Sequence, residues 1–257
     1  MRPAKITILA GFLLLAGSSH ATPASEPQIL VQFDQEPGTF THFVLSTEVF
    51  ARMPVFTLYD NGFLVHLTSD SVMAVQLSRE EARRIRDHVL ELGFMSLPAM
   101  HRAPVMDVGL SKMRVRVPSD EVREVQYTLY SEPRDVSDSI ETFLFGYHHP
   151  EEVPYIPERS TLVISANRVW HPNPSQPIKD PDWPLSADMM LPPMEGTIEW
   201  AFILNRVDYG KVRAQIGSRM HSIFQAKEGL RQVLVRPWLP GEDYEKEVLS
   251  SGTFPRR

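Results

Sequence analysis

The sequence contains no cysteine among its 257 residues, and this absence excludes several kinds of chemistry. Disulfide cross-links, cysteine nucleophiles and thiolate metal ligands all require a thiol. A bacterial lipoprotein anchor is excluded as well, because its lipid is attached to a cysteine. Burial of apolar side chains must therefore hold the chain together, and a chain of this length can bury enough of them.

Long apolar runs are also scarce, and the one at the N-terminus is too short to span a membrane. Arg2 and Lys5 precede a mostly apolar segment at 6–17, and Ser19-His20-Ala21 then supplies small residues at the two positions that signal peptidase reads. A membrane-spanning helix needs about 20 apolar residues. The pattern predicts a signal peptide at residues 1–21, cleaved after Ala21. The alternative is an uncleaved helix that lies in the membrane interface.

Positive charge is in deficit. Removal of residues 1–21 takes away two cationic residues and no acidic one, which leaves 24 lysines and arginines against 32 acidic residues, a net charge of −8. Nucleic acids and anionic membranes bind clustered cations, so both are disfavoured as partners. Exported eukaryotic domains usually carry disulfides, so we expect a soluble protein of the bacterial periplasm or secreted fraction. An envelope protein or a glycan is the expected partner.

Proline, by contrast, is plentiful and unevenly spread. Ten of the 22 prolines fall between Pro150 and Pro193, and such a segment cannot run as one helix or central strand. Only residues 161–169 within it have the pattern of a strand. The predicted organisation is a signal peptide at 1–21, an N-terminal α+β unit at 22–150, a Pro-rich connection at 151–196, a C-terminal βαβ unit at 197–240 and a flexible tail at 241–257.

The N-terminal unit opens with strong local signals. Alternation over residues 28–34 predicts a half-buried strand. The apolar segments 55–59 and 63–67 flank Asp60-Asn61-Gly62, which predicts a tight hairpin because these residues tolerate positive φ. Ser78 and Glu81 form a capping box. The box opens a helix that should end at Gly93, and the predicted apolar stripe of that helix is Ala82, Ile85, Val89 and Leu92.

A second hairpin and helix follow in the same unit. Residues 112–117 and 124–129 alternate between charged or polar and apolar side chains. Matching the apolar faces predicts that Val115 lies opposite Val125 and Arg116 opposite Glu124, with a loop at 119–121. Asp135 or Ser137 should cap a short helix that carries Ile140, Phe143 and Leu144 on its inner face.

The C-terminal unit repeats this order of elements. A strand is predicted at 198–204, then a helix capped by Asn205 and Asp208 with a stripe from Tyr209 to Met220, and a last strand at 230–239. Two units, each with strands and a helix, predict an α+β fold with largely antiparallel sheets and helices packed on one face.

Several short motifs resemble those of a family of bacterial exported proteins and lipoproteins of unknown function. They are Ile29–Gln32, Gly38, Pro54–Gly62, Gln76–Ser78, Trp183–Leu185 and Arg236–Pro240. The resemblance implies export and the same fold, and it implies no activity. Many members carry an anchoring cysteine that this chain lacks.

Signatures of catalysis and metal binding are missing. The sequence has neither the Gly-x-Ser-x-Gly nucleophile elbow nor the His-Glu-x-x-His zinc motif. The cluster at 148–152 (HHPEE) is interpreted as a solvated helix end rather than a metal site. Asp180 and Asp182 are interpreted as a stiff acidic turn rather than a calcium loop. His101 and Asp107, both before the strand that begins at Lys112, are a candidate acid–base pair. No catalytic residue, metal ligand or cofactor is assigned.

Aromatic side chains in the Pro-rich segment are the remaining candidates. Trp170, His171 and Trp183, with Tyr155 nearby, could stack on a sugar or anchor a partner protein. The alternative is that these rings are buried and pin an irregular loop to the sheets. The sequence therefore favours a non-enzymatic binding or interaction module. The alternatives are an envelope hydrolase with scattered carboxylates or a His–Asp pair, and an inhibitor or chaperone with a free sheet edge.

Overall fold

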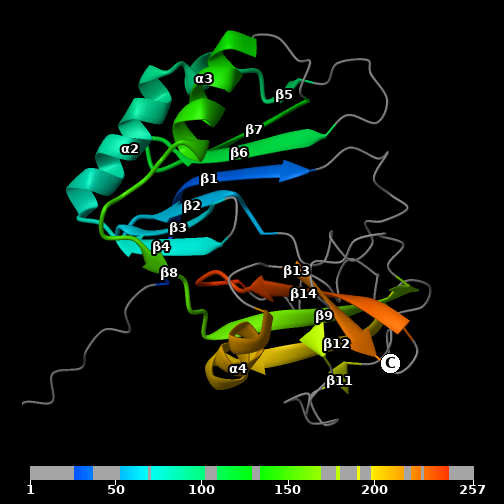
Figure 1. The fold of residues 1–257 in the computed structure, drawn as a ribbon. Helices are drawn as coiled ribbons and strands as arrows, with labels where there is room; N and C mark the ends of the chain where they lie inside the picture. The colour runs from blue at the N-terminus through cyan, green and yellow to red at the C-terminus, as the bar shows by residue number, and fades with distance from the viewer. Residues whose placement is uncertain are drawn as a thin grey trace, which may run out of the picture.

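The computed structural model of the chain describes residues 26–36, 53–68, 71–101, 109–128, 134–168, 178–179, 190–191, 198–216, 221–226 and 229–242. Within these residues the fold is α+β and consists of two open sheets with three α-helices (Figure 1). The predicted fold class is therefore confirmed. The signal peptide at 1–21 and most of the tail lie outside the described residues.

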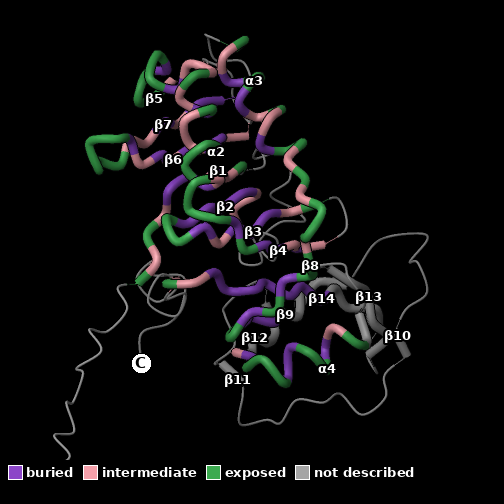
Figure 2. The backbone as a smooth tube through the Cα atoms, turned by 90° about the vertical axis from the view of Figure 1, so that its left-hand side faces the viewer, coloured by how far each residue is buried: buried purple, intermediate pink, exposed green. Residues whose placement is uncertain are grey.

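The first sheet has eight strands in the order β5-β7-β6-β1-β2-β3-β4-β8. All neighbouring strands are antiparallel except β5 and β7. Two helices, α2 (Arg79–Glu91) and α3 (Arg134–Phe145), cover one face of this sheet, and a 3-10 turn at Phe94–Ser96 follows α2 (Figures 1 and 2). The strands are β1 Ile29–Glu36, β2 Phe56–Tyr59, β3 Phe63–Leu67, β4 Val72–Gln76, β5 Met100–His101, β6 Leu110–Arg116, β7 Val122–Thr128 and β8 Val153–Pro154.

Local sequence signals account for most of these elements. β2 and β3 form the predicted hairpin, with Gly62 at φ 87° in its turn. Ser78 caps α2 through the predicted capping box with Glu81, and Gly93 takes the left-handed conformation after the helix. Apolar side chains of α2 and α3 pack against the strands in one core, whose largest fully buried members include Phe33, Phe56, Leu58, Phe94 and Leu144.

The β6–β7 hairpin corrects the predicted register. Met113, not Val115, lies opposite Val125, and Arg114, not Arg116, lies opposite Glu124. The loop is Pro118–Asp120, because the N–H of Val117 donates to the carbonyl of Glu121. Pro118 has no N–H to continue the ladder, and Asp120 takes a positive φ of 70°. A shift of two residues keeps the same side chains inward.

The second sheet is formed by strands between residues 159 and 237, in the order β10-β13-β14-β9-β12-β11. α4 (Arg206–Ile216) packs on β9 and β12. Asn205 caps it by accepting the backbone N–H groups of Val207 and Asp208, as predicted. The strands are β9 Arg159–Arg168, β10 Ile178–Lys179, β11 Met190–Leu191, β12 Ile198–Asn205, β13 His221–Ala226 and β14 Gly229–Pro237.

Other boundaries depart from the predictions. α3 begins at Arg134, so Asp135 and Ser137 lie inside its first turn and do not cap it. β4 and β13 were not predicted, and β13 makes the C-terminal unit β-α-β-β rather than βαβ. The Pro-rich connection contains short paired strands besides the expected β9.

A second apolar cluster joins the two sheets. Along β3, Leu64 belongs to the helix-side core, while its neighbour Val65 points to the opposite face and packs with Tyr155 and Leu239. Tyr155 Oη donates to the carbonyl of Trp238 at 2.7 Å, and Tyr59 Oη donates to that of Pro240 at 3.0 Å. The end of β14 is thus fixed beneath the first sheet, and the two halves of the chain share buried contacts.

Candidate functional site: a groove beside helix α3

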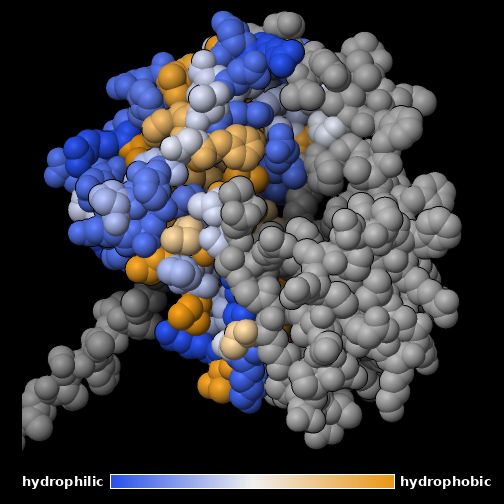
Figure 3. Space-filling model, in the orientation of Figure 1, coloured by the Kyte–Doolittle hydropathy of each residue, from blue (hydrophilic) through white to orange (hydrophobic). Residues whose placement is uncertain are grey.

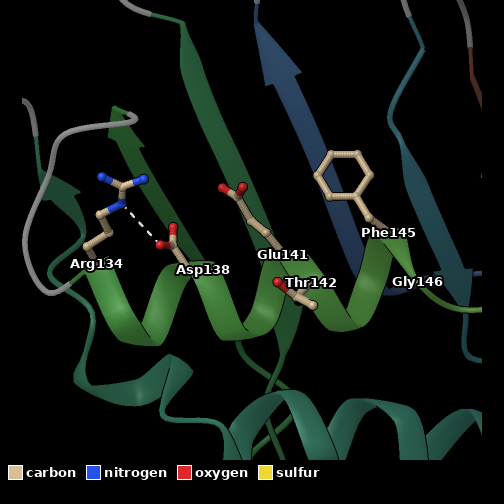
Figure 4. A pocket seen from close by; sticks show the side chains of 6 residues that line it. All are labelled: Arg134, Asp138, Glu141, Thr142, Phe145 and Gly146. Carbon is tan, nitrogen blue, oxygen red and sulfur yellow. Dashed lines mark hydrogen bonds and ion pairs between the residues drawn. The ribbon is translucent and has the colours of Figure 1, made fainter.

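A hollow of about 600 Å³ runs along one side of α3. Its lining residues recur at nearly helical spacing, because residues three and four apart share a helix face. Figure 4 shows their side chains along that side of α3, in front of the strands of the first sheet. They are Arg134, Asp138, Glu141, Thr142, Phe145 and Gly146, and we call this hollow the α3 groove.

Glu141 is the most perturbed ionisable group of the groove. Its Oε1 accepts hydrogen bonds from Tyr127 Oη at 2.8 Å and from Ser111 Oγ at 3.2 Å, which reach it from β7 and β6. Burial raises the pKa of Glu141, although both hydroxyls oppose the change. Burial and the charge of Glu141 also raise the pKa of Tyr127, so the phenol keeps its proton and remains a donor.

The rest of the groove combines an ion pair with an exposed ring. Arg134 Nε donates to Asp138 Oδ2 at 3.0 Å, and both side chains are about half exposed. Phe145 is 47% exposed and rests edge-on against buried Phe33, with ring centroids 5.4 Å apart at 89°. The groove therefore offers hydrogen-bond donors, acceptors and an apolar ring that is held in place from below.

A buried polar cluster lies near the β8 end of the same sheet. His66 on β3 and Glu152, just before β8, are each 3% exposed in their side chains, and Nε2 and Oε1 are 3.1 Å apart. Oε1 lies off the direction of a hydrogen on Nε2, so the contact is electrostatic rather than a directed hydrogen bond. Oε1 also accepts the backbone N–H of His149, and Oε2 lies 3.0 Å from Nδ1 of His148.

Burial acts on both ionisable groups of this cluster, His66 and Glu152, but the balance differs between them. Burial lowers the pKa of His66, and the nearby carboxylate only partly offsets this. Burial would raise the pKa of Glu152, but the His149 N–H and the two histidines lower it overall. The predicted solvated helix end is correct for His148, which is 78% exposed, and wrong for Glu152. The cluster ties the α3–β8 connection to β3, a structural role.

The structure tests only some of the candidates from the sequence. Trp170, His171 and Trp183 lie outside the described residues, as do Asp107, Asp180 and Asp182. His101 lies on β5, where it pairs with Tyr127. Tyr155 is buried between the sheets and is not a surface ring. Over the described ranges, no group of three or more histidine or acidic side chains could hold a metal ion.

Sequence reasoning missed the residues of the α3 groove. Glu141 interrupts the inward set of Ile140, Phe143 and Leu144, and at sequence level it is one more acid on an amphipathic helix. The one available signal was an aromatic residue, Phe145, directly after the apolar stripe, where its ring would face away from the core.

Comparisons with known proteins give no further lead. No protein-family model, curated protein or solved structure matches the chain. Among the described helices, none is long and apolar enough to cross a membrane.

Proposed function

We propose that the chain is an exported, soluble module of the bacterial envelope that binds a glycan in the α3 groove and catalyses no reaction. The N-terminal pattern at 1–21 supports export. The observation that carries the proposed activity is the exposed ring of Phe145 beside the polar side chains of the groove.

The chemistry of the groove suits a ligand rich in hydroxyl groups. Arg134 and Thr142 can donate hydrogen bonds, Asp138 can accept them, and Phe145 can pack against the apolar face of a sugar ring. Glu141 already receives two protein hydroxyls, which fixes its orientation before a ligand arrives.

A partner protein that adds a strand fits less well. One edge of the first sheet is β8, a strand of two residues with described residues on both sides. Short edge strands offer few backbone groups to a partner. The α3 groove is instead lined by side chains of one helix and the glycine after it, which favours recognition of a glycan.

Binding of a soluble tetramer of N-acetylglucosamine, measured by titration calorimetry, tests the proposal. We expect Phe145→Ala to weaken binding about tenfold, because it removes the only ring of the groove. Met95→Ala is the matched control, since Met95 is 50% exposed and lies outside the groove. Absence of binding by the unmodified protein, or equal losses for the two variants, would contradict the proposal.

One observation favours a second candidate function, an envelope hydrolase. A carboxyl group with a raised pKa in an open groove is typical of a general acid, and Glu141 has both properties. This alternative predicts that the oligosaccharide is cleaved into shorter products, as detected by chromatography, and that Glu141→Gln abolishes cleavage. Binding without any cleavage supports the non-enzymatic proposal.

A further inference from the structure

A second hollow lies between α2 and α3 and shares no lining residue with the α3 groove. Its volume of about 360 Å³ falls within the range of small-molecule sites. Over these two helices, Figure 3 shows a band of hydrophobic side chains bordered by hydrophilic ones. The lining residues are Glu81, Arg84, Ile85, His88, Phe143 and Tyr147, and we call this hollow the α2–α3 pocket.

Three aromatic rings form one wall of the pocket. The rings of His88 and Phe143 are 4.7 Å apart at 75°, and those of Phe143 and Tyr147 are 6.4 Å apart at 82°. Because consecutive rings are nearly perpendicular, the wall presents both ring faces and ring edges. Ring faces attract organic cations, so this wall suits a substituted ammonium group.

A fixed negative charge stands at the same pocket. Oε2 of Glu81 accepts hydrogen bonds from the Ser78 hydroxyl at 2.7 Å and from the Ser78 backbone N–H at 2.9 Å. These bonds lower the pKa of Glu81, so the carboxylate is ionised at neutral pH. The capping box that begins α2 thus also orients an anion beside the aromatic wall.

Arg84 supplies the opposite charge one helical turn further along α2. It is exposed, and its positive charge adds to the lowering of the Glu81 pKa. A guanidinium group binds a carboxylate or phosphate through two parallel hydrogen bonds. The pocket therefore combines a site for a cation with a site for an anion about one turn apart.

We propose that the α2–α3 pocket binds a small zwitterion, whose organic cation lies against the aromatic wall and Glu81 and whose anionic group pairs with Arg84. A purely apolar ligand would leave two opposite charges of the pocket unused. Among the described residues, those that line the pocket include a single carboxylate and a single histidine, too few to hold a metal ion. This inference is independent of the glycan proposed for the α3 groove, since the two hollows share no residue.

Glycine betaine, which carries a trimethylammonium and a carboxylate group, is a suitable probe for the full chain. In an NMR titration of the ¹⁵N-labelled protein we expect saturable shifts at residues of the α2–α3 pocket, with a Kd of about 1 mM. Tetramethylammonium chloride and sodium acetate, each with half of the chemistry, should bind at least about fivefold more weakly.

Two variants and one control make the result specific. Arg84→Gln and Phe143→Leu should each weaken betaine binding about fivefold. Arg83→Gln is the matched control, because Arg83 is an exposed neighbour that does not line the pocket. Phe143 is half-buried, so Arg84→Gln decides the question if Phe143→Leu does not fold. Absence of saturable shifts, acetate binding as tight as betaine, or equal effects of Arg83→Gln and Arg84→Gln would overturn the proposal.

Discussion

We expect Glu152 to make a large contribution to stability, because it is buried beside His66 of a distant part of the chain. Its carboxylate is 3% exposed and accepts the backbone N–H of His149, beside His66, which is equally buried. Substitution by alanine removes one charge-assisted hydrogen bond, worth about 1.5–3 kcal/mol, and leaves a partly buried N–H and a buried imidazole without their partner. The contact with His148 adds little, because that side chain is 78% exposed.

We therefore expect Glu152→Ala to lower the free energy of unfolding by about 3 kcal/mol at pH 7, or the midpoint temperature by about 9 °C. Urea denaturation followed by circular dichroism measures the change. The pKa of Glu152 is lowered in the folded protein, so its contribution is present above pH 4.5 and is lost as the pH falls through the folded value. The difference between the two proteins should shrink over that range.

His148→Ala is the control for this prediction, because it removes only the exposed partner of the same carboxylate. We expect a loss below about 0.5 kcal/mol. A loss below about 1 kcal/mol for Glu152→Ala, or a loss equal to that of the control, would refute the reasoning that burial makes this carboxylate important.

Two other substitutions test the first sheet, and a third, outside that sheet, serves as a control. Gly62→Ala should cost about 3 kcal/mol in urea denaturation, because a Cβ there would lie 2.2 Å from the carbonyl oxygen of Leu77 at a φ of +87°. Gly241→Ala, at φ +78° with nothing within 4 Å, should cost only about 1 kcal/mol, and equal costs would contradict the steric argument. Glu124→Gln should cost less than about 1 kcal/mol at pH 7, because the carboxylate is 35% exposed. Burial alone would raise the pKa of Glu124, but the hydrogen bond from Arg114 and its other partners lower the pKa to about 2. The cost of Glu124→Gln should therefore vanish in denaturation series as the pH falls from 4.5 to 2. A cost that stays constant over this range would contradict the prediction.

Local signals in the sequence were sufficient for the elements whose physics is local. The capping box at Ser78, the turn at Gly62 and the left-handed Gly93 each depend on residues within a few positions, and all three are confirmed. The β6–β7 register failed by two residues. Alternation fixes which side chains face inward but not where the loop closes, and that depended on Pro118 and the positive φ of Asp120.

The candidate site could not be predicted in the same way, because its properties depend on contacts between distant segments. Glu141 meets Ser111, 30 residues earlier in the chain, only after α3 packs on the sheet. The burial of Glu152 likewise depends on His66, and that of Tyr155 on Trp238, 83 residues later. Sequence periodicity indicates which face of a helix is apolar, but it does not indicate what lies opposite a polar residue at the border of that face.

The most direct test of the central proposal is mass spectrometry of the protein purified from its native envelope or growth medium, alongside its Phe145→Ala variant. The account predicts a mature N-terminus at Thr22, after cleavage behind Ala21, and a glycan that copurifies with the unmodified protein and is depleted in the variant. A chain that still begins at Met1, or a variant that retains the same glycan in the same amount, would contradict it.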